Sequence, residues 1–158
     1  MLISYVALKH GLRAAAVACL LAAIGAGLGG AAMYGWSARD PAAALKAVSA
    51  VPAVSTGMIV RASAAMDREG WFAAALKGPV NSTPYKVYAL LAPSKGVGLP
   101  GFAFSALPVR LPRFLLVALG FSILRYFLRE RIDARWLMTG FTAGWLLFYV
   151  WFWATHPG

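Results

Sequence analysis

The feature that most constrains this chain is a long uncharged apolar run near its start. No charged residue occurs in residues 14–34. As a helix this run is about 30 Å long, which is the thickness of the hydrocarbon core of a bilayer. Secretory signal peptides have apolar regions of only about 7–15 residues. The run therefore predicts a retained transmembrane helix over residues 12–36 rather than a cleaved leader.

The overall composition extends this conclusion to the rest of the chain. Of its 158 residues, 61% are hydrophobic and 13% are charged, whereas soluble domains carry about 25% charged residues. A soluble fold of this size could not bury so much apolar surface, but a bilayer accepts it. Residues 108–128 and 136–155 predict two more transmembrane helices. The first of these must take at least one of its flanking arginine pairs into or near the apolar zone.

The basic residues flank or interrupt the apolar runs. The net charge is +10, which suggests nucleic-acid binding in a soluble protein and cytoplasmic loop charge with anionic-lipid affinity in a membrane protein. Their placement favours membrane lipids as partners and no nucleic acid. The four arginines from 125 to 135 predict a basic cytoplasmic loop over residues 129–135, in which Glu130 and Asp133 pair with neighbouring arginines. The N-terminus is then cytoplasmic and the C-terminus external.

Residues 67–94 predict a re-entrant helical hairpin. Two apolar arms flank a polar centre, and each arm is only about 9–12 Å long as a helix, too short to cross a bilayer. Pro79 and Pro84 break any continuous helix and form the turn together with Asn81. The turn residues from 81 to 83 either bind a headgroup or satisfy backbone groups, and the second is favoured.

The remaining segments predict shorter structures. Residues 37–66 are expected to lie at the membrane interface or to pack beside the bundle, with Asp40 as the cap of a short helix that begins at Pro41. Asp67 is expected to be a helix N-cap rather than a proton carrier. Residues 97–109 predict a connector with a short helix. The fold class that follows is an all-α integral membrane protein, a single domain over residues 1–158, with about three transmembrane helices and one re-entrant hairpin.

Several kinds of chemistry find no support in the sequence. Cys19 is the only cysteine, so no intrachain disulfide can form. His10 and His156 lie at opposite ends of the chain, which argues against a metal site. No nucleophile–base pair and no glycine-rich phosphate loop occurs, so we expect neither an enzyme nor a cofactor.

One part of the chain resembles a known family. The motifs are Gly70-Trp71, Pro84-Tyr85-Lys86-Val87-Tyr88, a later Ser105, Arg110, Arg113 and Phe114, and the glycine-rich segment 25–35 with Tyr34. Over residues 14–128 they resemble the DedA family, also called the VTT or SNARE-associated Golgi protein family, and within it the small YqaA-like members. The resemblance implies two re-entrant hairpins braced by transmembrane helices. It also implies movement of phospholipids or polyprenyl-phosphate carriers between leaflets of the bacterial inner membrane, driven by proton motive force.

The chain departs from the family pattern in two places. It begins just before the first long helix, so the first hairpin with its acidic residue is missing, and Ala92-Pro93 stands where the family has Ala-Gly. The first departure puts proton coupling in question. The missing hairpin could come from a second protomer, from a separate protein, or from sequence upstream of Met1.

The candidate site is expected to bind a lipid phosphate. Lys86 would cost roughly 2.5–3.5 kcal/mol at membrane depth, which suggests a function, although it could also snorkel to the interface. Arg110 and Arg113 share a helix face and could bind phosphate bidentately, or be ordinary flanking charge. The resemblance adds Tyr85 and Ser105 to this site, and Ser105 could equally cap a helix.

Two functions stay open at this point. The first is a lipid transporter or scramblase-like protein of the DedA/VTT class. The second is a non-transporting assembly or packing partner, a degenerate half-protein. Gly25 and Gly29 form a G-x-x-x-G pair that could mediate a homo-oligomer or pack against a helix of the same chain.

Overall fold

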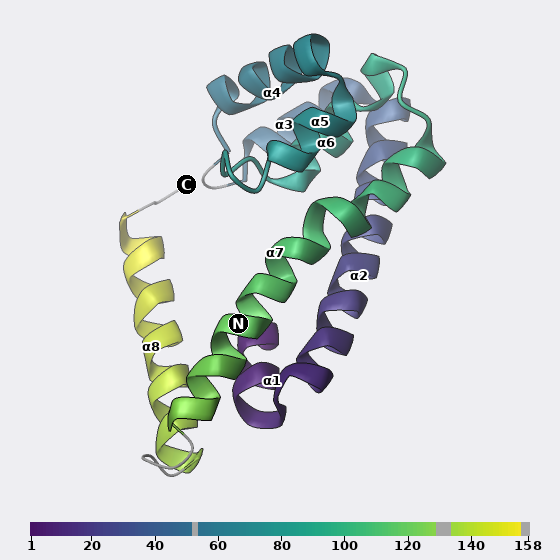
Figure 1. Ribbon diagram of the computed structural model, residues 1–158. Helices are drawn as coiled ribbons and strands as arrows, with labels where there is room; N and C mark the ends of the chain where they lie inside the picture. The colour runs from purple at the N-terminus through teal and green to yellow at the C-terminus, as the bar shows by residue number, and fades with distance from the viewer. Residues whose placement is uncertain (52–53, 129–133, 156–158) are drawn as a thin grey trace. The chain divides into compact units, whose positions relative to one another are not determined.

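A computed structural model of the chain describes residues 1–51, 54–128 and 134–155. These residues form eight α-helices and one 3-10 helix: α1 (Leu2–His10), α2 (Leu12–Arg39), α3 (Pro41–Ser49), α4 (Thr56–Glu69), α5 (Trp71–Lys77), α6 (Tyr85–Leu91), η1 (Pro93–Lys95), α7 (Leu99–Leu128) and α8 (Ala134–Thr155) (Figure 1). The described part of the chain contains no strand, in agreement with the predicted all-α class. The basic loop with Glu130 and Asp133 lies outside the described residues, except for Ala134 and Arg135.

Three helices are long and apolar enough to cross a membrane. They are α2, α7 and the part of α8 from Arg135 to Thr155. The prediction of about three membrane-spanning helices is confirmed at the level of length and composition, and it is consistent with a multi-pass membrane protein. The chain divides into two compact units, one formed by residues 1–22 and those from 111 onward, the other by residues 23–110.

The helix α7 begins well before the predicted start. It starts at Leu99, so residues 99–109 belong to it and the predicted connector there is wrong. Pro108 and Pro112 lie inside the helix, where proline normally removes a hydrogen bond and kinks the chain. Buried side chains at the helical spacing, Phe102, Ala106 and Val109, hold this stretch helical through packing.

The interfacial segment holds two helices instead of one. The prediction for α3 is confirmed, since Asp40 Oδ1 accepts a hydrogen bond from the Ala43 amide at 2.9 Å and Pro41 occupies the first turn. The second helix, α4, is capped by Ser55, which accepts from the Met58 amide at 3.2 Å. Asp67 lies in the last turns of α4, so the prediction that it caps a helix start is wrong.

In the second unit, α3 to α6 gather around the second half of α2 and the start of α7 (Figure 1). The two long helices approach closely at glycines: a Cβ on Gly27 would lie 3.0 Å from the Ala103 carbonyl oxygen, and one on Gly30 would lie 2.7 Å from the Tyr85 ring. Cβ atoms on Gly25 and Gly29 would meet nothing within 4 Å. Packing inside the second unit therefore uses Gly27 and Gly30. The predicted G-x-x-x-G face of Gly25 and Gly29 has no described neighbour packed against it.

The first unit packs through small side chains. Ala7 of α1, Ala15 and Cys19 of α2, and Ala118 of α7 form a fully buried cluster. Cys19 thus serves as a small buried apolar residue. The helix α8 contacts α1, with the rings of Tyr5 and Phe141 6.4 Å apart, and leaves most of its aromatic side chains exposed. Such an apolar exterior is what a lipid-facing helix requires.

Candidate functional site

The centre of the candidate site is Tyr85, the first residue of α6. Pro84, in extended conformation, ends the preceding turn and lets α6 begin there. The Tyr85 ring is buried and stacks on the Phe102 ring of α7, with centroids 5.0 Å apart and an angle of 16°. The α6 start is thereby fixed against α7 inside the second unit.

The hydroxyl of Tyr85 is fully used within the protein. It lies 2.7 Å from the Phe102 carbonyl oxygen and 3.0 Å from Ser105 Oγ, and Ser105 Oγ lies 2.6 Å from the same carbonyl, so two hydroxyl hydrogens are shared among three contacts. The structure thus brings together two of the predicted site residues, Tyr85 and Ser105, as a buried hydrogen-bonded pair. Ser105 lies inside α7, so the alternative that it caps a helix start is wrong. Burial raises the pKa of the Tyr85 phenol, which stays neutral.

Arg110 contacts the same tyrosine. Its guanidinium carbon lies 5.5 Å from the centroid of the Tyr85 ring, within the range of a cation–π interaction. Arg110 follows Phe102 and Ser105 on α7 and is half-buried. The ring face therefore orients a guanidinium group, whose planar fork matches the oxygens of a phosphate.

Lys86 follows Tyr85 on α6 and is also half-buried. Burial lowers the pKa of its ammonium group, because removal from water disfavours the charged form. The three carboxylates of the second unit are used elsewhere. Asp40 caps α3, Asp67 pairs with Lys95, and Glu69 pairs with Lys77 and Arg68. Among the described residues, no carboxylate therefore forms an ion pair with Lys86.

Arg113 belongs to the first unit and is exposed. The helix α7 is continuous from Arg110 to Arg113, so their spacing remains one helical turn, as predicted. The convergence of Arg113 with Lys86 stays a prediction.

The segment predicted to be a hairpin folds as two short helices joined by a turn. Each of α5 and α6 has 7 residues, and the turn between them closes through its own backbone. The amides of Val80 and Asn81 donate to the Lys77 carbonyl at 3.0 and 3.1 Å, and the Thr83 amide donates to the Gly78 carbonyl at 2.9 Å. The turn therefore satisfies these amides with its own carbonyl groups, and the role of the polar side chains from 81 to 83 stays a prediction. Insertion of the hairpin into the membrane stays a prediction.

Two ion pairs that the sequence did not reveal hold the arms in place. Lys95 Nζ lies 2.6 Å from both carboxylate oxygens of Asp67, and Lys77 Nζ lies 2.6 Å from Glu69 Oε2. Both acids come from the end of α4, while the lysines come from α5 and from η1, just beyond α6. The sequence does not indicate these ion-pair partners, because residues such as Asp67 and Lys95, 28 positions apart, are brought together only by the tertiary fold.

Comparison of the chain with family models, with curated proteins and with solved structures finds no match. The DedA/VTT resemblance therefore continues to rest on the residues given above. No group of three metal-ligating side chains occurs within the part of the chain that the structure describes.

Proposed function

We propose that this chain is an inner-membrane protein that moves or scrambles a phosphate-bearing lipid between leaflets. The observation that carries the proposal is the placement of two half-buried cations around one tyrosine. Lys86 is its neighbour on α6, and Arg110 lies over its ring. Cations in a partly buried setting are retained in membranes mainly when they pair or serve a function.

The headgroup phosphate is the natural partner of these cations. Arg110 would donate hydrogen bonds from its fork to two phosphate oxygens, and Lys86 would add a point charge. Binding of the anion would offset the desolvation that lowers the Lys86 pKa. No covalent bond is formed or broken in such a step, so the proposed activity is transport and not catalysis. Arg113, one turn further along α7, would receive the headgroup next.

A second function, assembly with a partner chain, is favoured by a separate observation. The G-x-x-x-G face formed by Gly25 and Gly29 is open in this chain, and such faces allow close helix approach. A second copy or another protein could pack against this face. The chain would then act as a packing partner.

A lipid-flip assay distinguishes the two functions. The purified chain is reconstituted into vesicles that contain fluorescent phosphatidylglycerol, and the accessible fraction is bleached from outside. We expect the parent to expose inner-leaflet lipid faster than protein-free vesicles do, and the double variant Lys86→Gln/Arg110→Gln to lose most of this activity. Lys46→Gln, which removes an exposed charge on α3, is the matched control. A parent that never exceeds protein-free vesicles would favour the assembly function.

A further inference from the structure

In the first unit, the turn between α1 and α2 receives an arginine from far along the chain. Gly11 forms this turn with a φ of 85°, a backbone conformation that favours glycine. A Cβ built on Gly11 would lie 2.5 Å from Nη1 of Arg125. The half-buried guanidinium of Arg125 is therefore seated directly against the glycine backbone, in space that any other residue would occupy.

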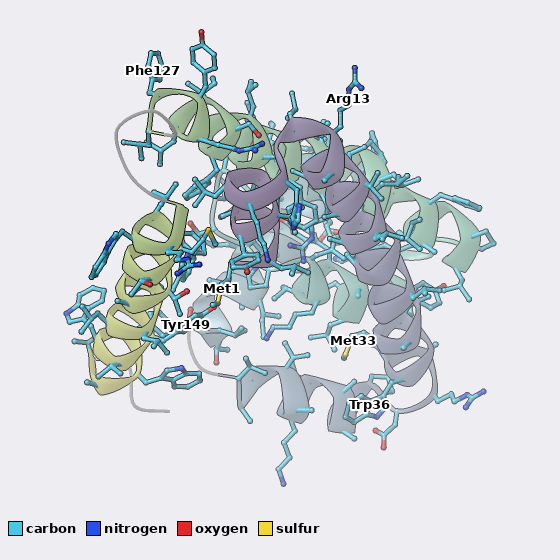
Figure 2. All side chains as sticks on the ribbon, turned by 90° about the horizontal axis from the view of Figure 1, so that it is seen from below. Met1, Arg13, Met33, Trp36, Phe127 and Tyr149 are labelled. Carbon is cyan, nitrogen blue, oxygen red and sulfur yellow. The ribbon has the colours of Figure 1, made fainter. Side chains whose placement is uncertain are left out.

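More positive charge surrounds this turn. Lys9, His10 and Arg13 are each within two residues of Gly11, so their backbones lie within about 7 Å of it. Lys9 Nζ lies 3.4 Å from the Tyr5 hydroxyl, and Arg13 is exposed and points away from the ribbon (Figure 2). At least three unit charges thus share one end of the unit.

Nothing described in this unit carries a full negative charge. The described residues of the first unit contain no aspartate or glutamate. The end of α1 contributes only about half a negative charge through its helix dipole. Like charges gathered at such distances repel one another, and the repulsion strengthens as water is excluded. Among the described residues of this unit, the arrangement therefore favours the binding of an anion.

We propose that the Gly11 turn and Arg125 form a binding site for the phosphate of an anionic lipid headgroup, separate from the Lys86 and Arg110 site. Arg125 would hold the phosphate on its fork, with Lys9 and Arg13 beside it. The site lies where α2 begins and α7 ends, two of the three helices able to span a membrane, which is the depth of lipid headgroups. Binding at this site requires no transport and goes beyond the function proposed above. Inorganic phosphate has the same chemistry as a lipid headgroup phosphate, so the test distinguishes these two ligands.

Lipid binding to the full-length purified chain tests this site. Native mass spectrometry in a zwitterionic detergent would compare phosphatidylglycerol, phosphatidylcholine and inorganic phosphate. We expect the parent to prefer phosphatidylglycerol, and Arg125→Gln to bind it about fivefold more weakly, as the loss of one basic contact at a membrane surface implies. Arg125→Lys should fall between them because it keeps the charge but loses the fork. Inorganic phosphate that displaces phosphatidylglycerol at matched concentration would identify a soluble anion as the ligand.

The control is Lys46→Gln, which removes one exposed charge from α3 in the other unit. It should bind phosphatidylglycerol as the parent does. Circular dichroism and gel filtration would show whether each variant is folded. If Arg125→Gln does not fold, the folded Arg125→Lys variant still tests the proposal. Equal phosphatidylglycerol binding by the parent, Arg125→Lys and every other folded Arg125 variant would overturn the proposal.

Discussion

At the scale of single residues, Tyr85 can prepare a site without touching the ligand. Its ring is fixed by stacking on Phe102, and its hydroxyl is held by Phe102 and Ser105. What remains for function is the contact between its ring and Arg110. Tyr85 is thus better described as a positioning residue for that guanidinium than as the headgroup contact that the family resemblance suggests.

This role predicts that the ring of Tyr85 matters more than its hydroxyl. Tyr85→Phe should retain most headgroup binding, whereas Tyr85→Leu should weaken it by roughly 2- to 30-fold, the loss of a cation–π contact of about 0.5–2 kcal/mol. Binding of phosphatidylglycerol to the purified variants measures this. If Phe weakens binding as strongly as Leu does, the hydroxyl itself contacts the lipid and the positioning role is wrong.

The charge of Lys86 should stabilise lipid binding and should destabilise the fold of the lipid-free protein. Burial lowers its pKa in the folded state, so its charged form destabilises the fold fully at pH values below that lowered pKa. The penalty disappears as the pH rises past the ordinary lysine value. We expect Lys86→Met to raise the thermal stability of the lipid-free protein while it weakens phosphatidylglycerol binding.

The control for this prediction is Lys46→Met, an exposed lysine on α3. It should change neither the melting temperature nor lipid binding. A Lys86→Met protein that is less stable than the parent in the absence of lipid would show that the ammonium group already has a stabilising partner.

At the scale of elements, the end of α4 fixes the geometry of the two short helices. Asp67 binds Lys95 and Glu69 binds Lys77, so the end of α4 is linked to α5 and to η1, which follows α6. Each pair is partly exposed and should contribute modestly, about 0.2–1 kcal/mol for Asp67 with Lys95. Their value lies in holding the arms at a defined spacing.

Reversing one pair tests this arrangement. Asp67→Lys should make the turn between α5 and α6 more sensitive to protease, and the swapped double variant Asp67→Lys/Lys95→Asp should restore resistance. The half-lives of the intact chains under limited proteolysis are the measurement. A double variant no better than Asp67→Lys would show that the pair does not secure the arms.

The second pair adds a pH dependence. Lys77 and then Arg68 lower the pKa of Glu69, because both donate hydrogen bonds to its carboxylate. A lowered carboxylate pKa gives a contribution that is present above the ordinary glutamate value and is lost as the pH falls through the lowered one. Protease sensitivity of the turn should therefore rise under acidic conditions in the parent and stay flat in Glu69→Gln.

The elements also show where sequence reasoning succeeds. Hydropathy predicted the three long apolar helices, Pro79 and Pro84 predicted the break between α5 and α6, and the Asp40-Pro41 signature predicted α3, because these depend on local sequence. The start of α7 was missed because Pro108 read as a boundary, while packing of Phe102 and Ala106 keeps the helix intact. The partners of Asp67 and Glu69 were missed because they depend on the tertiary fold, as does the contact between Arg110 and Tyr85.

At the scale of the whole molecule, the sequence predicts which side of the membrane the ends of the hairpin face. Cysteines at Arg68 and Ser94, both exposed, should be labelled from the same side of the membrane if the segment between them is a re-entrant hairpin. The background would carry Cys19→Ala, which suits a buried apolar position. Labelling from opposite sides would show that the hairpin crosses the bilayer.

The two prolines inside α7 have a consequence for water. Proline has no amide hydrogen, so the carbonyl oxygens of Phe104 and Pro108 lack the donors at Pro108 and Pro112 that a regular helix would supply. These positions are one turn apart and exposed, on a helix whose exterior is otherwise oily. Hydrocarbon offers such oxygens nothing, so we expect water to hydrate them. The bilayer should therefore be wetter and thinner beside this stretch of α7, which is also the stretch that presents Arg110 and Arg113.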